Sequence, residues 1–73
     1  MARQIVMDHT GDTRHEFDAK DVRSLAEAEW RFKELTGLGF TPAKRLGDGK
    51  SELLRGFDPT AEETIFMPRL KGG

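Results

Sequence analysis

At 73 residues the chain has room for one small domain, and its formal net charge of −1 gives no general attraction to phosphate backbones or anionic membranes. It has no cysteine, which excludes disulfides, thiolate metal sites and a cysteine nucleophile. No apolar run approaches the roughly 20 residues that a membrane-spanning helix requires. These features predict a soluble, cytoplasmic domain that binds neither nucleic acid nor membranes.

The chain opens on two short runs that predict a β-hairpin. Gln4 to Asp8 and Thr13 to Asp18 carry apolar residues and are separated by a turn in which Gly11 can adopt a positive φ. Phe17 is the only strongly apolar residue of the second run, so the pattern leaves the pairing register open.

The next segment has the clearest periodicity of the chain and predicts a helix from Asp21 to Thr36. Asp18 or Asp21 can cap its first turn. Gly37 can end it in the left-handed conformation, with Leu38 folding back over the helix towards Phe32. The predicted buried stripe consists of Val22, Leu25, Ala28, Phe32 and Leu35.

A second hairpin and a final strand are predicted after the helix. Ala43 to Leu46 and Ser51 to Phe57 form the arms, joined by the turn Gly47 to Lys50. Thr64 to Met67 is the most β-prone run, and Pro68 stops it because proline has no N–H to donate. The predicted class is α+β: hairpin, helix, hairpin and final strand in one mixed sheet, with one long helix packed on one face.

Residues 1–68 are therefore predicted to form one domain, and residues 69–73 a slim, flexible tail. The tail reads Arg69-Leu70-Lys71-Gly72-Gly73. Two glycines without Cβ atoms can pass through a narrow channel, and they leave the terminal carboxylate unhindered. This composition suits a protein whose carboxylate is itself the reacting group, although an inert terminus has the same composition.

Trp30 is the second candidate contact residue. On a helical wheel it lies about 140° from Leu25, away from the predicted stripe. An exposed tryptophan can anchor a protein partner. The alternative is that a loop or the N-terminus covers it.

Two polar clusters are given structural rather than chemical roles. The first cluster consists of Asp8, His9, Asp12 and His15, and adjacent strand side chains point to opposite faces, which argues against a metal site there. The second cluster consists of Lys44, Arg45, Lys50 and Arg55. Acidic residues lie among them and no aromatic residue is available for base stacking, so a solvated surface is expected. We expect no metal, no cofactor and no catalytic residue.

Both ends of the chain resemble ubiquitin and its β-grasp relatives, which include bacterial sulfur-carrier proteins. Gln4-Ile5-Val6-Met7 followed by Thr10-Gly11-Asp12-Thr13 resembles the first strand and turn of ubiquitin. Glu63 to Gly73 resembles its last strand and diglycine end. The order of predicted elements matches over most of the chain, and residue-level likeness is confined to these two segments.

The resemblance implies a β-grasp-like fold and a protein modifier or sulfur carrier without catalysis of its own. Gly73, preceded by Gly72, would be activated by an ATP-dependent adenylating enzyme, with Arg69, Leu70 and Lys71 as contacts. Its expected partners are that enzyme and a conjugation target or sulfur acceptor, and the protein itself is expected to be a monomer. Two alternatives stay open: a bacterial or phage non-covalent interaction module with an inert tail, and a small metal-dependent or acid–base enzyme.

Overall fold

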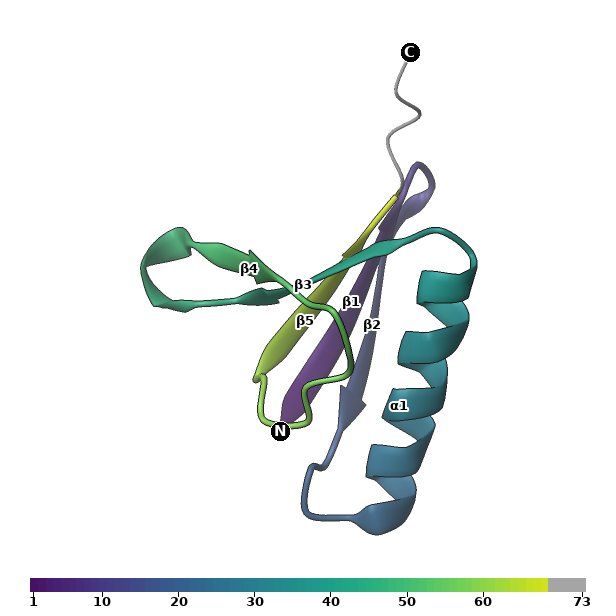
Figure 1. The fold of residues 1–73 in the computed structure, drawn as a ribbon, viewed down its shortest axis with the longest axis vertical. Coiled ribbons are helices and arrows are strands. Elements are labelled where there is room, and N and C mark those ends of the chain that lie inside the picture. The colour runs from purple at the N-terminus through teal and green to yellow at the C-terminus, as the bar shows by residue number, and fades with distance from the viewer. Residues whose placement is uncertain (69–73) are drawn as a thin grey trace.

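The computed structural model describes residues 1–68, and the predicted tail at residues 69–73 lies outside them. One helix packs on one face of a five-stranded open sheet with the order β2-β1-β5-β3-β4 (Figure 1). β1 and β5 are parallel, and the other neighbouring pairs are antiparallel. The elements are β1 (Ala2–Asp8), β2 (Gly11–Phe17), α1 (Val22–Gly37), β3 (Thr41–Arg45), β4 (Ser51–Leu53) and β5 (Glu63–Met67).

The predicted fold class, α+β with one helix on a mixed sheet, is therefore confirmed. The arrangement is compatible with a β-grasp. No helix within residues 1–68 is long and apolar enough to cross a membrane.

The first hairpin pairs from Ala2 opposite Phe17 to Asp8 opposite Gly11, which settles the register that the sequence left open. Its turn is fixed by the carboxylate of Asp8, whose Oδ1 accepts hydrogen bonds from the backbone N–H and the hydroxyl of Thr10 at 2.8 and 2.5 Å. Gly11 has a φ of 131°, as predicted from its lack of a Cβ. The strands start earlier than predicted because pairing extends to Ala2.

The helix begins as predicted and ends differently. Asp21 is the N-cap: its Oδ1 accepts from the backbone N–H groups of Arg23 and Ser24 at 3.0 and 3.5 Å. The prediction that Gly37 ends the helix in the left-handed conformation is wrong. Leu38 is still right-handed and Gly39 takes the positive φ of 103°. Leu38 is consequently exposed rather than folded back over the helix.

Val22 is a second correction, because it is 83% exposed although it was placed in the buried stripe. It lies about 60° around the helix from Leu25, at the edge of the stripe. Ala28 and Phe32 are buried as predicted.

The core between helix and sheet contains aromatic rings and one buried amide. Phe32 contacts Phe66 and Phe57 with ring centroids 5.7 and 5.8 Å apart, and Phe57 also lies 6.0 Å from Phe17. The buried Gln4 donates from Nε2 to the carbonyl oxygen of Ala28 at 2.9 Å, while its Oε1 accepts from Arg31. Both ends of the amide are thereby satisfied.

The second hairpin is shorter than predicted. Its second arm accounts for this, since β4 ends at Leu53 instead of continuing to Phe57, whereas β3 begins earlier than predicted, at Thr41. The chain leaves the sheet after Leu53 because Phe57 gains more by packing between Phe17 and Phe32 than it would in an exposed edge strand. The hairpin projects from the rest of the domain (Figure 1). Pro68 follows the last strand directly, so its predicted role as a stop is confirmed.

Candidate functional site

The last strand delivers the chain to one end of the sheet. Because β5 runs parallel to β1, Met67 lies at the end where β1 finishes and the turn into β2 begins (Figure 1). Pro68 is exposed there. The predicted site residues that follow lie outside the described residues; they are Arg69, Leu70, Lys71, Gly72 and Gly73.

The sheet face opposite α1, which we call the open face, carries one continuous apolar row. Gln4 contacts the helix, so its neighbour Ile5 points the other way. The register aligns Ile5 with Ile65, Ile65 with Ala43, and Ala43 with Leu53 across four strands. Leu53, on the edge strand, is 68% exposed, whereas the other three are buried.

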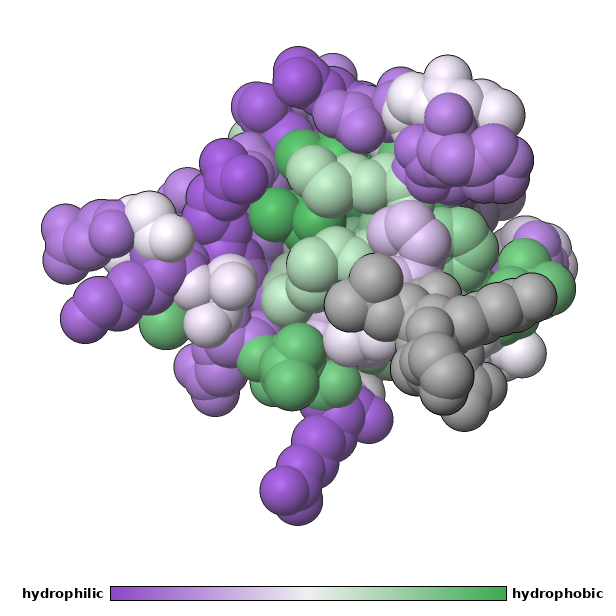
Figure 2. All heavy atoms as spheres, turned by 90° about the horizontal axis from the view of Figure 1, so that it is seen from above, coloured by the Kyte–Doolittle hydropathy of each residue, from purple (hydrophilic) through white to green (hydrophobic). Residues whose placement is uncertain are grey.

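A charged row runs beside this apolar row. Glu63 lies between two arginines: its carboxylate is 3.8 Å from Nη1 of Arg3 and 3.3 Å from Nη1 of Arg45. An apolar centre with a charged border is typical of surfaces that bind proteins. Figure 2 looks onto the end of the molecule rather than onto the open face, and shows apolar side chains in its middle with hydrophilic ones above and to the left.

Sequence reasoning missed the open face, although β1 and β5 carried a signal for it. Each strand has two adjacent apolar residues, Ile5-Val6 and Ile65-Phe66. Since adjacent side chains point to opposite faces, such a pair indicates apolar side chains on both sides of the sheet.

Trp30 lies on the outer side of α1, off the buried stripe as predicted, and is 65% exposed. No loop or terminus within residues 1–68 covers it. A shallow hollow of about 410 Å³ adjoins it. The hollow is lined by Arg23, Ala26, Glu27, Trp30 and Arg31.

The acidic and histidine residues of the first hairpin do not converge. Asp12 faces the open side and His15 the helix side, because they are three residues apart on one strand. Within residues 1–68, no three His, Asp or Glu side chains form a metal-binding group. Hydrogen bonds from Thr10 hold the pKa of Asp8 below its ordinary value. Partial burial, and then the charge of Arg31, lower the pKa of His15.

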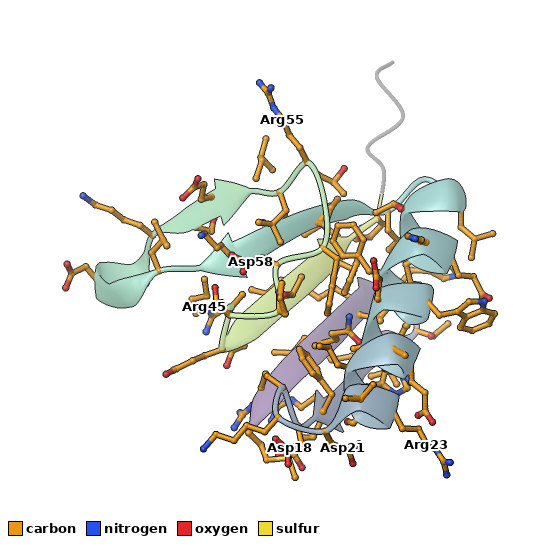
Figure 3. The ribbon with its side chains drawn as sticks, turned by 60° about the horizontal axis from the view of Figure 1, so that its bottom comes forward. Asp18, Asp21, Arg23, Arg45, Arg55 and Asp58 are labelled. Atoms are coloured by element: carbon orange, nitrogen blue, oxygen red, sulfur yellow. The ribbon has the colours of Figure 1, made fainter. Side chains whose placement is uncertain are left out.

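The basic residues around the second hairpin are divided between ion pairs and solvent. Lys44 is 3.2 Å from the carboxylate of Asp58. Arg45 is directed towards β5, whereas Arg55 points away from the domain (Figure 3). They therefore do not form one phosphate-binding track.

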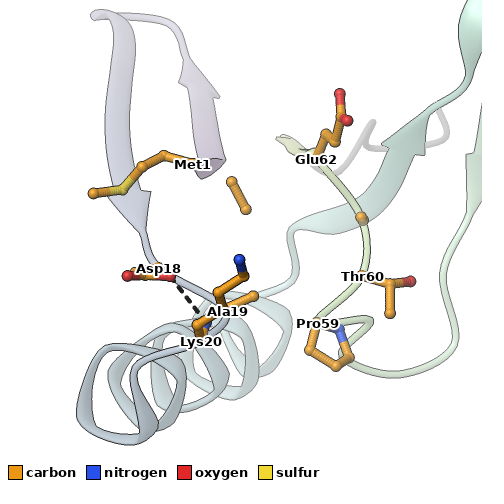
Figure 4. Close-up of a pocket in the computed structure, with 9 residues that line it drawn as sticks. Met1, Asp18, Ala19, Lys20, Pro59, Thr60 and Glu62 are labelled. Atoms are coloured by element: carbon orange, nitrogen blue, oxygen red, sulfur yellow. Dashed lines mark hydrogen bonds between the residues drawn. The ribbon is translucent and has the colours of Figure 1, made fainter.

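A second hollow lies at the opposite end of the sheet from Met67 (Figure 4). It has a volume of about 400 Å³ and is bordered by Met1, Lys20 and Glu62 among others. The hydroxyl of Thr60, which borders this hollow, donates to the carboxylate of Asp58 at 2.6 Å. Asp18 accepts from the backbone N–H of Lys20 at 2.9 Å. These contacts join residues two positions apart and stabilise the loops that border the hollow.

In comparisons with family models, curated proteins and solved structures, nothing matches this chain. Function is therefore inferred from its residues and their geometry alone.

Proposed function

We propose that this protein is a ubiquitin-like modifier or sulfur carrier that is activated at Gly73. The observation that carries the proposal is the position of β5: it is central in the sheet, parallel to β1, and ends at Met67, five residues before Gly72. The described domain thus lies a few residues before the carboxylate that is proposed to react, and Gly72 and Gly73 add no side-chain bulk beside it. The order β2-β1-β5-β3-β4 with one helix across it also suits the β-grasp fold that the two ends of the sequence resemble.

The chemistry proposed for the terminus needs an external enzyme and ATP. An oxygen of the Gly73 carboxylate attacks the α-phosphorus of ATP, and pyrophosphate leaves. The acyl-adenylate is then attacked by a thiol, which gives a thioester and AMP, or by hydrosulfide, which gives a thiocarboxylate and AMP. The chain contributes no catalytic group of its own.

Tail length limits where the enzyme can touch the domain. Five extended residues span at most about 17 Å. An enzyme that holds Gly73 in its active site must therefore contact the domain near the end of β5. Arg69 and Lys71 would guide the tail.

The test is ATP–pyrophosphate exchange with a candidate adenylating enzyme, for example one encoded beside this gene. The intact chain should support exchange, and a variant that lacks Gly72 and Gly73 should not. A matched control, Lys20→Ala, changes an exposed residue at the opposite end of the sheet from Met67 and should leave exchange unaffected. Equal exchange by the intact and the shortened chain would overturn the proposal.

A second candidate function is a non-covalent interaction module, favoured by the exposed Leu53 and the charged border of the open face. In that case the shortened chain would keep every partner of the intact chain. Leu53→Glu would abolish their binding while leaving the fold unchanged.

A further inference from the structure

The outer side of α1 faces away from the sheet, and no other described element packs against it (Figures 1 and 3). Three apolar residues follow one another there at four-residue intervals: Val22, Ala26 and Trp30. This spacing places them on one ridge of the helix. All three are exposed, in contrast to the ordinary polar outer face of a surface helix.

The ridge combines a protruding residue with a hollow. Trp30 protrudes, while the small side chain of Ala26, one turn earlier, leaves the hollow of about 410 Å³ beside it. Next to it on the same side of α1 lies another hollow, which is lined by Asp21, Val22, Arg23 and Ala26. An indole ring entering from outside would therefore meet an apolar floor at Ala26.

We propose that two copies of this chain associate through this face, with their α1 helices antiparallel. In that arrangement Trp30 of each copy lies over Ala26 of the other. The contact uses the same patch twice and closes after two subunits, as a two-fold interface does. A burial of this kind removes the exposed tryptophan from water without any further segment of the chain.

The charges on the ridge select a second copy in this orientation. Arg23 and Glu34 lie on the same flank, about 20° and 40° around the helix from Trp30, near opposite ends of α1. Antiparallel pairing brings Arg23 opposite Glu34 of the second copy, whereas parallel pairing would leave the two opposite charges at opposite ends of the contact. Arg23 extends from the first turn away from the domain (Figure 3). Neither residue forms an ion pair within residues 1–68.

The interface is small, so association should be weak. A helix of 16 residues is about 24 Å long, which places its contact at the low end of specific interfaces. The inference departs from the monomer expected from the sequence. It does not depend on the proposed function, because a chain that lacks Gly72 and Gly73 should associate equally well.

Sedimentation equilibrium tests the association at protein concentrations up to about 1 mM, which suit a small, weak interface. The intact chain should shift from monomer to dimer, and its tryptophan emission should move to shorter wavelength over the same range. Trp30→Ala should remain monomeric. Leu53→Ala, which removes an equally exposed apolar residue from the open face, should associate as the intact chain does. A monomer at every concentration, or a dimer that Leu53→Ala rather than Trp30→Ala abolishes, would overturn the proposal.

A charge exchange tests the orientation. Arg23→Glu or Glu34→Arg alone should weaken association about tenfold, because the two-fold symmetry breaks two pairs at once. The double variant should return to within about threefold of the intact chain. A double variant as weak as the single variants would show that the helices do not pair in this way.

Discussion

The two faces of the sheet are built on different physical principles. The face under α1 is closed by aromatic rings and by the hydrogen-bonded amide of Gln4. No element within residues 1–68 covers the open face, where Ile5 and Ile65 are largely kept from water within the sheet surface, beside a row of charges. The covered face thus supplies most of the packing, whereas Leu53 is the one member of the aligned apolar row on the open face that is exposed.

The largest expected effect is the difference in unfolding free energy between variants of Phe66 and of Leu53. Phe66→Ala leaves a cavity beneath Phe32 and should cost about 3–5 kcal/mol of unfolding free energy, enough to unfold much of so small a domain. Leu53→Ala, on the exposed edge, should cost less than about 0.5 kcal/mol. Urea denaturation followed by circular dichroism measures both. Similar losses for the two variants would remove the distinction between the faces.

The buried amide gives the next effect. Gln4→Leu leaves the carbonyl of Ala28 and the guanidinium of Arg31 without their partner and should cost about 1–3 kcal/mol. Its counterpart on the open face is Arg3→Ala, which breaks an exposed ion pair and should cost at most about 1 kcal/mol. The same denaturation experiment applies. A Gln4→Leu variant as stable as the intact chain would show that the amide contributes nothing to closing the covered face.

A smaller effect is expected from pH. Burial and the charge of Arg31 lower the pKa of His15 in the folded state. As the pH falls, His15 is therefore protonated at a higher pH in the unfolded chain than in the folded one. The contribution of His15 to stability is complete above the unfolded pKa of about 6.5 and declines as pH falls below it. Thermal unfolding between pH 7.5 and 5 should show this decline, and His15→Gln should reduce it. His9→Gln, at an exposed position, is the control and should leave the slope unchanged.

The smallest effect is local. Hydrogen bonds from Thr60, and secondarily Lys44, lower the pKa of Asp58. Thr60→Val removes the hydroxyl donor and should raise that pKa towards its ordinary value, as followed by NMR titration of the carboxyl carbon. Thr10→Val should raise the pKa of Asp8 in the same way and leave that of Asp58 unchanged. An unchanged Asp58 titration in Thr60→Val would assign the shift to other groups.

The sequence predicted those parts of the fold that depend on neighbours along the chain. The first hairpin, the cap at Asp21, the buried Ala28 and Phe32, and the stop at Pro68 follow from local spacing and local chemistry. The wrong predictions concern residues whose positions are decided by packing against residues distant in the sequence. Phe57 leaves its predicted strand to join the core, which no neighbouring residue indicates.

The candidate sites divide in the same way. Sequence placed Trp30 away from the buried stripe, because a helical wheel needs only the 3.6-residue period. The sequence also shows Gly72 and Gly73 directly, without any structural argument. Only the tertiary structure aligned Ile5, Ile65, Ala43 and Leu53 into one row, because that row comes from four strands whose register is set by long-range pairing. It also decided which side of the sheet the single helix covers, and thereby which side is left open.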